Sequence, residues 1–223
     1  LVARGIESGD HEELARQAPV HAHMVMPVPE SGIPAAQGFA RASGIPYGDG
    51  VVKNRYIGRT FIAPTPETRA AGVRLKLNPI RENIAGKRLV VVDDSIVRGT
   101  TQLTLTRMLR EAGAAEVHLR VTSPPYRWPC FYGMDTGRRP ELLAADLQVG
   151  EVREYLGVDS LAYLDLDRLV AATGSSAESF CTACLSGEYP VPVPDADTKL
   201  ALEVEKVRPS RAAEPEASAR VEP

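Results

Sequence analysis

The sequence has 223 residues, of which 43% are hydrophobic, so it is long enough to bury the core of one large domain. It contains no run of about 18 apolar residues, which excludes a membrane-spanning helix. The 29 acidic residues outnumber the 26 lysines and arginines, and the net charge of −3 argues against general nucleic-acid binding. Three cysteines do not fit a secreted disulfide scaffold, and no targeting signal is visible, so we expect a cytoplasmic protein without nucleic-acid or membrane partners.

The first predicted elements are a strand and a helix. Residues 23–28 (HMVMPV) form a short apolar run that is typical of a buried strand. Apolar and small residues then recur at helical spacing over residues 36–43, and Gly44 ends this helix.

A second strand, helix and strand follow after a polar segment. Residues 87–92 (KRLVVV) suit the interior of a parallel sheet, and residues 116–121 form another strand. Between them lies a helix whose buried stripe covers residues 105–112 and which Gly113 ends. This order predicts an α/β fold with a parallel sheet flanked by helices.

The C-terminal part predicts smaller elements and a solvated tail. We expect helices at residues 149–156 and 166–172, on either side of a strand at 161–164. Residues 199–206 could form two helical turns. Residues 209–223 have almost no large apolar side chains, so we expect this tail to be disordered.

Residues 51–82 carry seven basic side chains and two acidic ones, whereas the whole chain is acidic. The segment also contains glycines and three prolines, so we expect a loop. Its cations could meet a negatively charged small molecule, but an ordinary solvated loop is the alternative.

The segment 89–101 (LVVVDDSIVRGTT) carries the strongest chemical signal. Four apolar residues lead a strand into the core, so Asp93 and Asp94 emerge at the carboxyl edge of the sheet, where open α/β folds bind ligands. Adjacent like charges need a cation or hydroxyl donors to satisfy them. On its own an aspartate pair would indicate a helix cap or a solvated turn.

The residues after the aspartates add a predicted phosphate site. Hydroxyls at Ser95, Thr100 and Thr101 and a glycine at Gly99 lead into a helix, whose first backbone N–H groups can hold a phosphate. Carboxylates that can bind sugar hydroxyls or Mg²⁺ therefore lie one short loop from a phosphate site, and this spacing fits a phosphorylated ribose.

This segment resembles the phosphoribosyl pyrophosphate (PRPP) motif of type I phosphoribosyltransferases. Four further segments are similar to glutamine PRPP amidotransferases, the amidophosphoribosyltransferase family: residues 28–36 (VPESGIPAA), 44–62 (GIPYGDGVVKNRYIGRTFI), 73–82 (VRLKLNPIRE) and 129–136 (PCFYGMDT). The resemblance covers roughly residues 24–190. It implies a type I phosphoribosyltransferase-like fold and transfer of nitrogen to C1 of PRPP, which gives 5-phosphoribosylamine and pyrophosphate in the first step of purine synthesis.

The resemblance also implies roles for individual residues. Asp93 and Asp94 would bind the ribose hydroxyls and, with Ser31, place Mg²⁺, while Ser95, Gly99, Thr100 and Thr101 would hold the 5′-phosphate. A flexible flap at about residues 51–82 would close over the pyrophosphate with Lys53, Arg55, Tyr56, Arg59 and Lys76, of which Lys53, Arg59 and Lys76 would be catalytic.

The three cysteines form the other candidate site. Cys181 and Cys184 stand in a CxxC pair, and Cys130 lies earlier, a pattern that suits Zn²⁺ or an iron–sulfur cluster but also small buried side chains. One branch of the resembled family binds a 4Fe–4S cluster with cysteines in these contexts, so the resemblance implies this cluster, with zinc as the alternative. The fourth ligand of the family lies upstream of this sequence.

The resembled family obtains ammonia from an amino-terminal glutaminase domain with a cysteine nucleophile. Residue 1 here is a leucine and no cysteine precedes Cys130, so we expect a fragment limited to the transferase half, without glutaminase activity. We expect a phosphoribosyltransferase domain at residues 1–173 and a cysteine-containing segment at 174–208. The resemblance further implies feedback inhibition by purine nucleotides and a homo-oligomer; a PRPP-sensing regulator and an inactive remnant are the alternatives.

Overall fold

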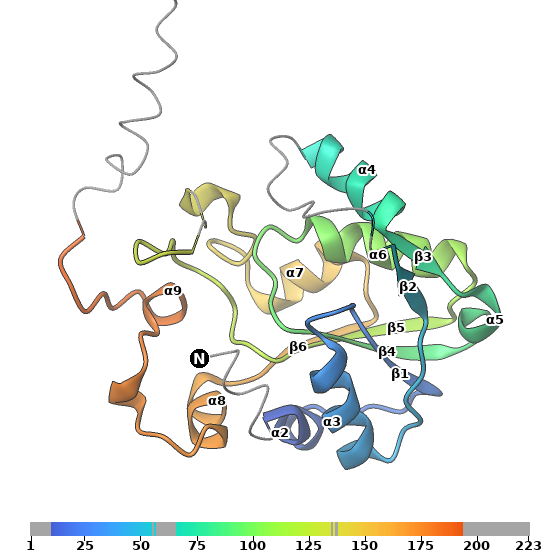
Figure 1. Cartoon of the computed structure of the whole chain (residues 1–223), viewed down its shortest axis with the longest axis horizontal. Coiled ribbons are helices and arrows are strands. Elements are labelled where there is room, and N and C mark those ends of the chain that lie inside the picture. Colours follow the sequence, from blue (N-terminus) through green and yellow to red (C-terminus); the bar gives the residue numbers. More distant parts are fainter. Residues whose placement is uncertain (1–9, 55, 57–65, 135, 137, 194–223) are drawn as a thin grey trace, which may run out of the picture. The chain divides into compact units, whose positions relative to one another are not determined.

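The computed structural model describes residues 10–54, 56, 66–134, 136 and 138–193, and its main feature is a four-stranded sheet (Figure 1). The strands are β1 (Met24–Pro27), β4 (Arg88–Asp93), β5 (Glu116–Val121) and β6 (Ser160–Tyr163). They are hydrogen-bonded in the order β1-β4-β5-β6, and every neighbouring pair is parallel. The predicted parallel sheet is therefore confirmed, and β4, which leads into the aspartate pair, is an interior strand.

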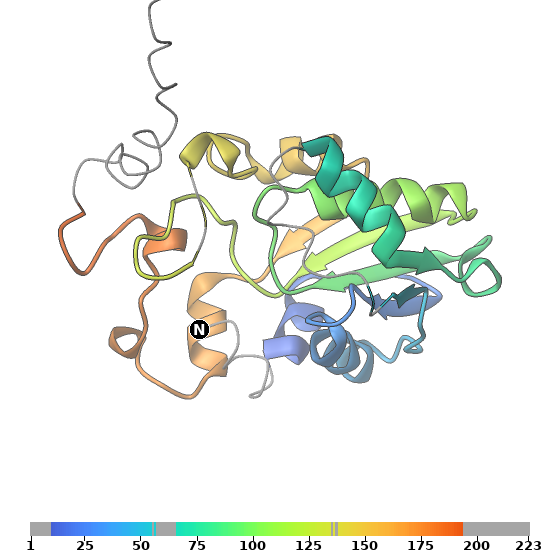
Figure 2. The ribbon, with the colours of Figure 1, turned by 45° about the horizontal axis from the view of Figure 1, so that its top comes forward.

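Helices cover both faces of this sheet (Figure 2). One face packs against α2 (Asp10–Gln17), α3 (Ile33–Ser43) and α8 (Leu166–Ala172), and the other against α6 (Thr100–Glu111) and α7 (Val149–Leu156). Val90 points into the first layer and Val91 into the second, and both are buried. Because successive strand residues face opposite sides, burial on both faces explains the continuous apolar run of β4.

The basic segment is more ordered than the sequence predicts. It contains β2 (Val51–Lys53), which pairs antiparallel with β3 (Leu77–Pro79), and the helices α4 (Pro66–Lys76) and α5 (Arg81–Ile84). The expectation of a loop is wrong for these residues. Val73 and Leu77 are each 2% exposed and belong to the core that α6 also covers, so tertiary packing stabilises elements that the local sequence pattern does not predict.

Most other predicted elements are confirmed. The helices at 149–156 and 166–172 begin and end where the sequence predicts them, whereas α3 begins three residues earlier than predicted, at Ile33. Pro34 lies in the first turn of α3, where the missing N–H of proline costs no helical hydrogen bond.

The remaining described elements are the 3₁₀ turns η1 (Arg139–Glu141) and η2 (Ala177–Ser179) and the short helix α9 (Ala183–Ser186). The helical turns expected at 199–206 and the tail at 209–223 lie outside the described residues. No helix among the residues that the structure describes is long and apolar enough to cross a membrane.

Candidate functional site

The candidate site lies at the carboxyl end of β4. Asp93 is the last residue of this strand, and its side chain is only 3% exposed. One carboxylate oxygen accepts the backbone N–H of Asp94 at 2.9 Å, and the other accepts the side-chain amide of Gln102 at 2.5 Å. Burial, and next the charge of Asp94, raise the pKa of Asp93 well above its usual value.

Asp94 is half-buried and connects the two neighbouring loops at this edge. The Ser31 hydroxyl donates to Asp94 Oδ1 at 3.0 Å, and the Ser95 hydroxyl donates to Oδ2 at 3.4 Å. Ser31 lies in the loop after β1, which reaches Asp94 because β1 and β4 are parallel neighbours and the N–H of Val28 bonds to the Val92 carbonyl. The structure therefore brings together four predicted site residues: Ser31, Asp93, Asp94 and Ser95.

The predicted phosphate loop leads directly into the first residue of α6. Gly99 is the N-cap residue of this helix and has a φ of +74°, a conformation that favours glycine. A Cβ atom at this position would also approach Leu143 Cδ2 to 2.5 Å, but the end of this side chain can move, so it is the backbone conformation that requires glycine. Thr100 and Thr101 form the first turn of α6, where the N–H groups lack helical partners and can bind an anion.

Two lysines of the basic segment lie near the Ser31 loop. Lys53 Nζ forms an ion pair with Glu30 Oε2 at 2.8 Å, and Glu30 immediately precedes Ser31. Burial, followed by the charge of Lys53, lowers the pKa of Lys76. Tyr56 is fully exposed, and Arg55 and Arg59 lie outside the described residues.

The cysteines lie in a separate region around Trp128. The backbone N–H groups of Arg127 and Trp128 both donate to the Cys184 carbonyl at 3.1 Å, and the Arg139 guanidinium stacks over the Trp128 ring. Burial raises the pKa of the Cys184 thiol, and Cys130 raises it further. In the part of the chain that the structure describes, no three His, Cys, Asp or Glu side chains form a group that could hold a metal ion.

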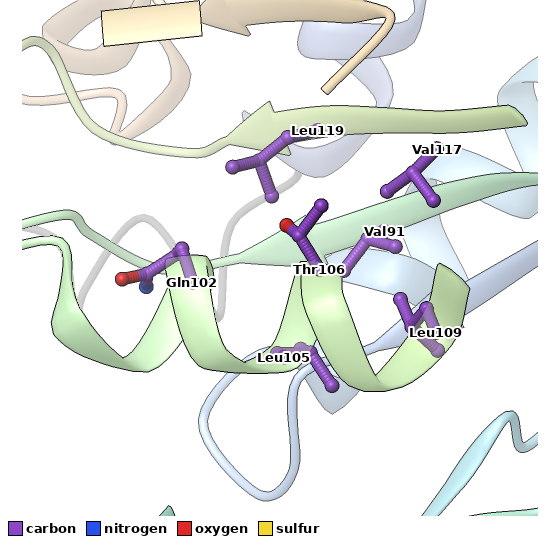
Figure 3. A pocket seen from close by; sticks show the side chains of 7 residues that line it. All are labelled: Val91, Gln102, Leu105, Thr106, Leu109, Val117 and Leu119. Atoms are coloured by element: carbon purple, nitrogen blue, oxygen red, sulfur yellow. The ribbon is translucent and has the colours of Figure 1, made fainter. Parts of the chain in front are cut away.

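Two residues that contact predicted site residues, Gln102 and Glu30, were not predicted from the sequence. Gln102 stands at helical spacing with Leu105 and Leu109, so a polar side chain in an otherwise apolar stripe was the available signal. Figure 3 shows Gln102 on the first turn of α6, at one end of a hollow between this helix and the sheet. This hollow has a volume of about 10 Å³, so it can hold at most one water molecule and is too small for a substrate.

Comparison with known proteins agrees with this geometry. The model of the phosphoribosyl transferase domain family matches residues 3–123, which is more than half of the sequence. The chain belongs to the phosphoribosyl transferase domain family. Its matched region includes β1, the aspartate pair and the loop before α6, and the predicted fold class is confirmed.

The most similar relatives include amidophosphoribosyltransferases. The chain is 54% identical over 196 residues to the enzyme of Synechocystis sp., with 88% of this chain and 40% of that protein aligned. It is 54% identical over 186 residues to the Mycobacterium tuberculosis enzyme, with 81% and 35% aligned. The solved B. subtilis glutamine PRPP amidotransferase in complex with ADP and GMP has a TM-score of 0.76 and 45% identity, covering 86% of this chain and 43% of that one.

The resemblance inferred from the sequence is therefore confirmed. The chain spans 40% of the length of the Synechocystis relative and 35% of the Mycobacterium tuberculosis relative, so the alignment covers only part of each.

Proposed function

We propose that this chain carries out the phosphoribosyl transfer of an amidophosphoribosyltransferase. The nitrogen of ammonia attacks C1 of PRPP, the bond from C1 to the pyrophosphate oxygen breaks, and the products are 5-phosphoribosylamine, pyrophosphate and a proton. The observation that carries this proposal is the Asp93–Asp94 pair, which is bonded to Ser31 and lies one loop before the amino end of α6. This arrangement offers carboxylates to a sugar and an anion site to its phosphate.

Different site residues would bind different parts of the substrate. Asp93 and Asp94 would bind the ribose hydroxyls, and Ser95 with Gly99–Thr101 would bind the 5′-phosphate. The cations over the pyrophosphate would be Lys53 and Lys76, joined by Arg55, Tyr56 and Arg59. Because the leaving group gains negative charge as its bond to C1 breaks, these cations would stabilise the transition state. Neutral ammonia has a free lone pair, so no general base is needed for its attack.

The oxygen ligands near Asp94 suit Mg²⁺. This ion commonly binds one or two carboxylates, water and substrate phosphates rather than a complete protein cage. Asp94 and Ser31 present a half-buried carboxylate and a hydroxyl, while Asp93 lies behind them and is held by Gln102. We therefore assign Mg²⁺ to Ser31 and Asp94, and we keep Asp93 as the further ligand that the family resemblance implies; the ion would neutralise substrate phosphate charge.

The 4Fe–4S cluster and its zinc alternative are less well supported. The sequence has three cysteines, whereas such a cluster takes four thiolates, and the described cysteines do not form a group of three metal ligands. We propose no reaction step through a metal at Cys130, Cys181 and Cys184. Metal analysis of the purified chain tests whether these thiols bind iron or zinc.

Further partners are proposed from the relatives. The bound ADP and GMP of the B. subtilis enzyme support purine nucleotides as inhibitors of this chain. From the similarity to amidophosphoribosyltransferases we also propose that a glutaminase domain supplies the ammonia. We propose on the same basis that the protein is a homo-oligomer and lies in the cytoplasm. We retain the division into a transferase domain at residues 1–173 and a cysteine-containing segment at 174–208.

The test is release of pyrophosphate by the purified chain with PRPP, Mg²⁺ and a high concentration of ammonium at mildly alkaline pH. We expect turnover that depends on all three, and a loss of at least about 100-fold in Asp94→Asn, because this change removes a charge at the substrate. Asp146→Asn is the matched control: the Asp146 side chain is 81% exposed and pairs with Arg139, which is not one of the proposed site residues. Binding of PRPP without turnover would contradict the proposal in favour of a PRPP sensor, and absence of binding would favour an inactive remnant.

A further inference from the structure

Gln102 makes an unusual pair of contacts at the candidate site. Its side-chain nitrogen lies 2.5 Å from Asp93 Oδ2 and 3.3 Å from the backbone carbonyl of Ser95. Both partners are acceptors, and a glutamine amide has two N–H donors, so both contacts require the nitrogen rather than the oxygen of the amide. One side chain on α6 thus connects the end of β4 with the beginning of the phosphate loop.

This contact lies in a closed environment. Gln102 is 6% exposed and Asp93 is 3% exposed, and no lysine or arginine among the described residues forms an ion pair with Asp93. The Gln102 amide and the backbone N–H of Asp94 are therefore the donors that the structure gives to this carboxylate. A hydrogen bond to a carboxylate is stronger and more directional than one between neutral groups, so the amide restrains rotation of the carboxyl plane.

A restrained carboxyl plane has a consequence for the neighbouring substrate site. Asp93 has one oxygen bonded to the Asp94 N–H and the other to Gln102, which leaves defined lone-pair directions for any further donor. Without Gln102 the second oxygen would lose its partner and the carboxyl group could turn. Residues that hold a ligating carboxylate in this way often matter nearly as much as the ligand itself.

We propose that Gln102 is a positioning residue, which holds the Asp93 carboxylate in the orientation that binds a ribose hydroxyl of the phosphoribosyl donor. The inference rests on the proposed function, because it assigns the hydroxyl contact to Asp93. Gln102 itself would not touch the donor, because its amide nitrogen bonds to Asp93 and to the Ser95 carbonyl. The Asp93 contact is the shorter of the two, at 2.5 Å against 3.3 Å, and its loss should affect one ribose hydroxyl, whereas loss of packing or of the Ser95 contact should weaken all donors alike.

The test compares Gln102→Met with the wild-type chain. Methionine keeps the unbranched shape and removes both N–H donors. Binding of three donors is measured by calorimetry with Mg²⁺ and without ammonia: PRPP, its 2-deoxy analogue and its 3-deoxy analogue. We expect Q102M to bind PRPP about tenfold more weakly and to bind at least one deoxy analogue within twofold of the wild type, because that analogue lacks the hydroxyl that Asp93 holds. In turnover, KM for PRPP should rise about tenfold with little change in kcat, as for a contact made in both ground and transition states.

Thr106→Val is the matched control. Thr106 lies one turn further along α6, is 5% exposed and lines the same hollow as Gln102 (Figure 3). T106V should bind all three donors as the wild type does. If Q102M loses its cooperative thermal transition, the same titrations with Gln102→Ala test the inference instead. Alanine favours the helix and also removes both N–H groups of the glutamine amide.

Three outcomes would overturn the inference: unchanged PRPP affinity in folded Q102M, equal losses for all three donors, or the same losses in T106V. Equal losses for all three donors would mean that Gln102 acts through packing or through the phosphate loop, and the same losses in T106V would mean that it acts through packing alone. A wild-type chain that binds none of the donors would instead overturn the proposed function, so the two failures are distinguishable.

Discussion

Gly32 occupies a position where a single methyl group should disturb the candidate site. It lies between Ser31 and α3 and has a φ of −75°, which alanine adopts without strain. A Cβ atom there would lie 2.5 Å from the Val92 carbonyl oxygen and 2.8 Å from the Val28 carbonyl oxygen. The consequence of Gly32→Ala is therefore steric, and it falls on the backbone contact between the loop after β1 and the end of β4.

The size of the disturbance follows from these distances. Moving the Cβ atom from 2.5 Å to the 3.4 Å of ordinary contact requires a displacement of about 0.9 Å. Overpacking of this kind costs about 1–3 kcal/mol of the free energy of unfolding, which corresponds to a Tm lower by roughly 2–10 °C for a chain of this size. The same displacement would separate the Ser31 hydroxyl from Asp94, now 3.0 Å apart, so we expect kcat/KM for PRPP to fall about 100-fold.

Thermal unfolding and ammonia-dependent pyrophosphate release measure the two effects. Gly150→Ala is the control, because Gly150 lies in α7 and a Cβ atom added there would meet nothing within 4 Å. The free energy of unfolding of this variant should rise by up to about 1 kcal/mol, because alanine favours a helix more than glycine does. A G32A variant with the Tm and turnover of the wild type would refute the steric reasoning. Loss of turnover in G150A as well would show that the assay reports general damage to the fold.

Two further substitutions test electrostatic contacts. Burial alone would raise the pKa of Asp159, but the Val117 N–H at 2.6 Å and the Arg110 guanidinium at 2.5 Å outweigh it and lower the pKa. The resulting stability is present above the unfolded pKa, near 3.8, and is lost as the pH falls through the folded pKa. Asp159→Asn should therefore lower Tm by about 2–4 °C at neutral pH, since a half-exposed ion pair contributes about 1 kcal/mol to the free energy of unfolding. At strongly acidic pH the decrease in Tm should be much smaller. An equal decrease at both pH values would contradict an electrostatic origin of this stability. Glu30→Gln should release Lys53 from its 2.8 Å ion pair and lower KM for the anionic PRPP by up to about fivefold. The decrease should be largest at low salt, where charges are least screened. A higher KM would show that Glu30 orients Lys53 for the substrate rather than competing with the substrate for it.

The pattern of apolar residues predicted those helices and strands whose buried side chains recur at regular spacing in the sequence. The apolar run before Asp93 predicted β4, and the helices at 149–156 and 166–172 were predicted to the residue. The pattern failed over α4, a basic helix: among residues 71–76, whose burial the structure describes, Val73 is the buried one, and it packs with residues of α6. Periodicity within one segment carries little information about such a contact.

The order of residues was sufficient to predict the strand, the acidic pair and the start of the helix for which we propose anion binding, because these three features follow one another directly in the sequence. Only the folded chain decided how Asp93 and Asp94 differ. Parallel pairing of β1 with β4 brings Ser31, 63 residues away, to Asp94, and the return of α6 over the sheet places Gln102 against Asp93. Burial then separates two chemically identical neighbours, because Asp93 ends β4 beneath Gln102 of α6, whereas Asp94 lies in the bend that follows the strand and is half-buried.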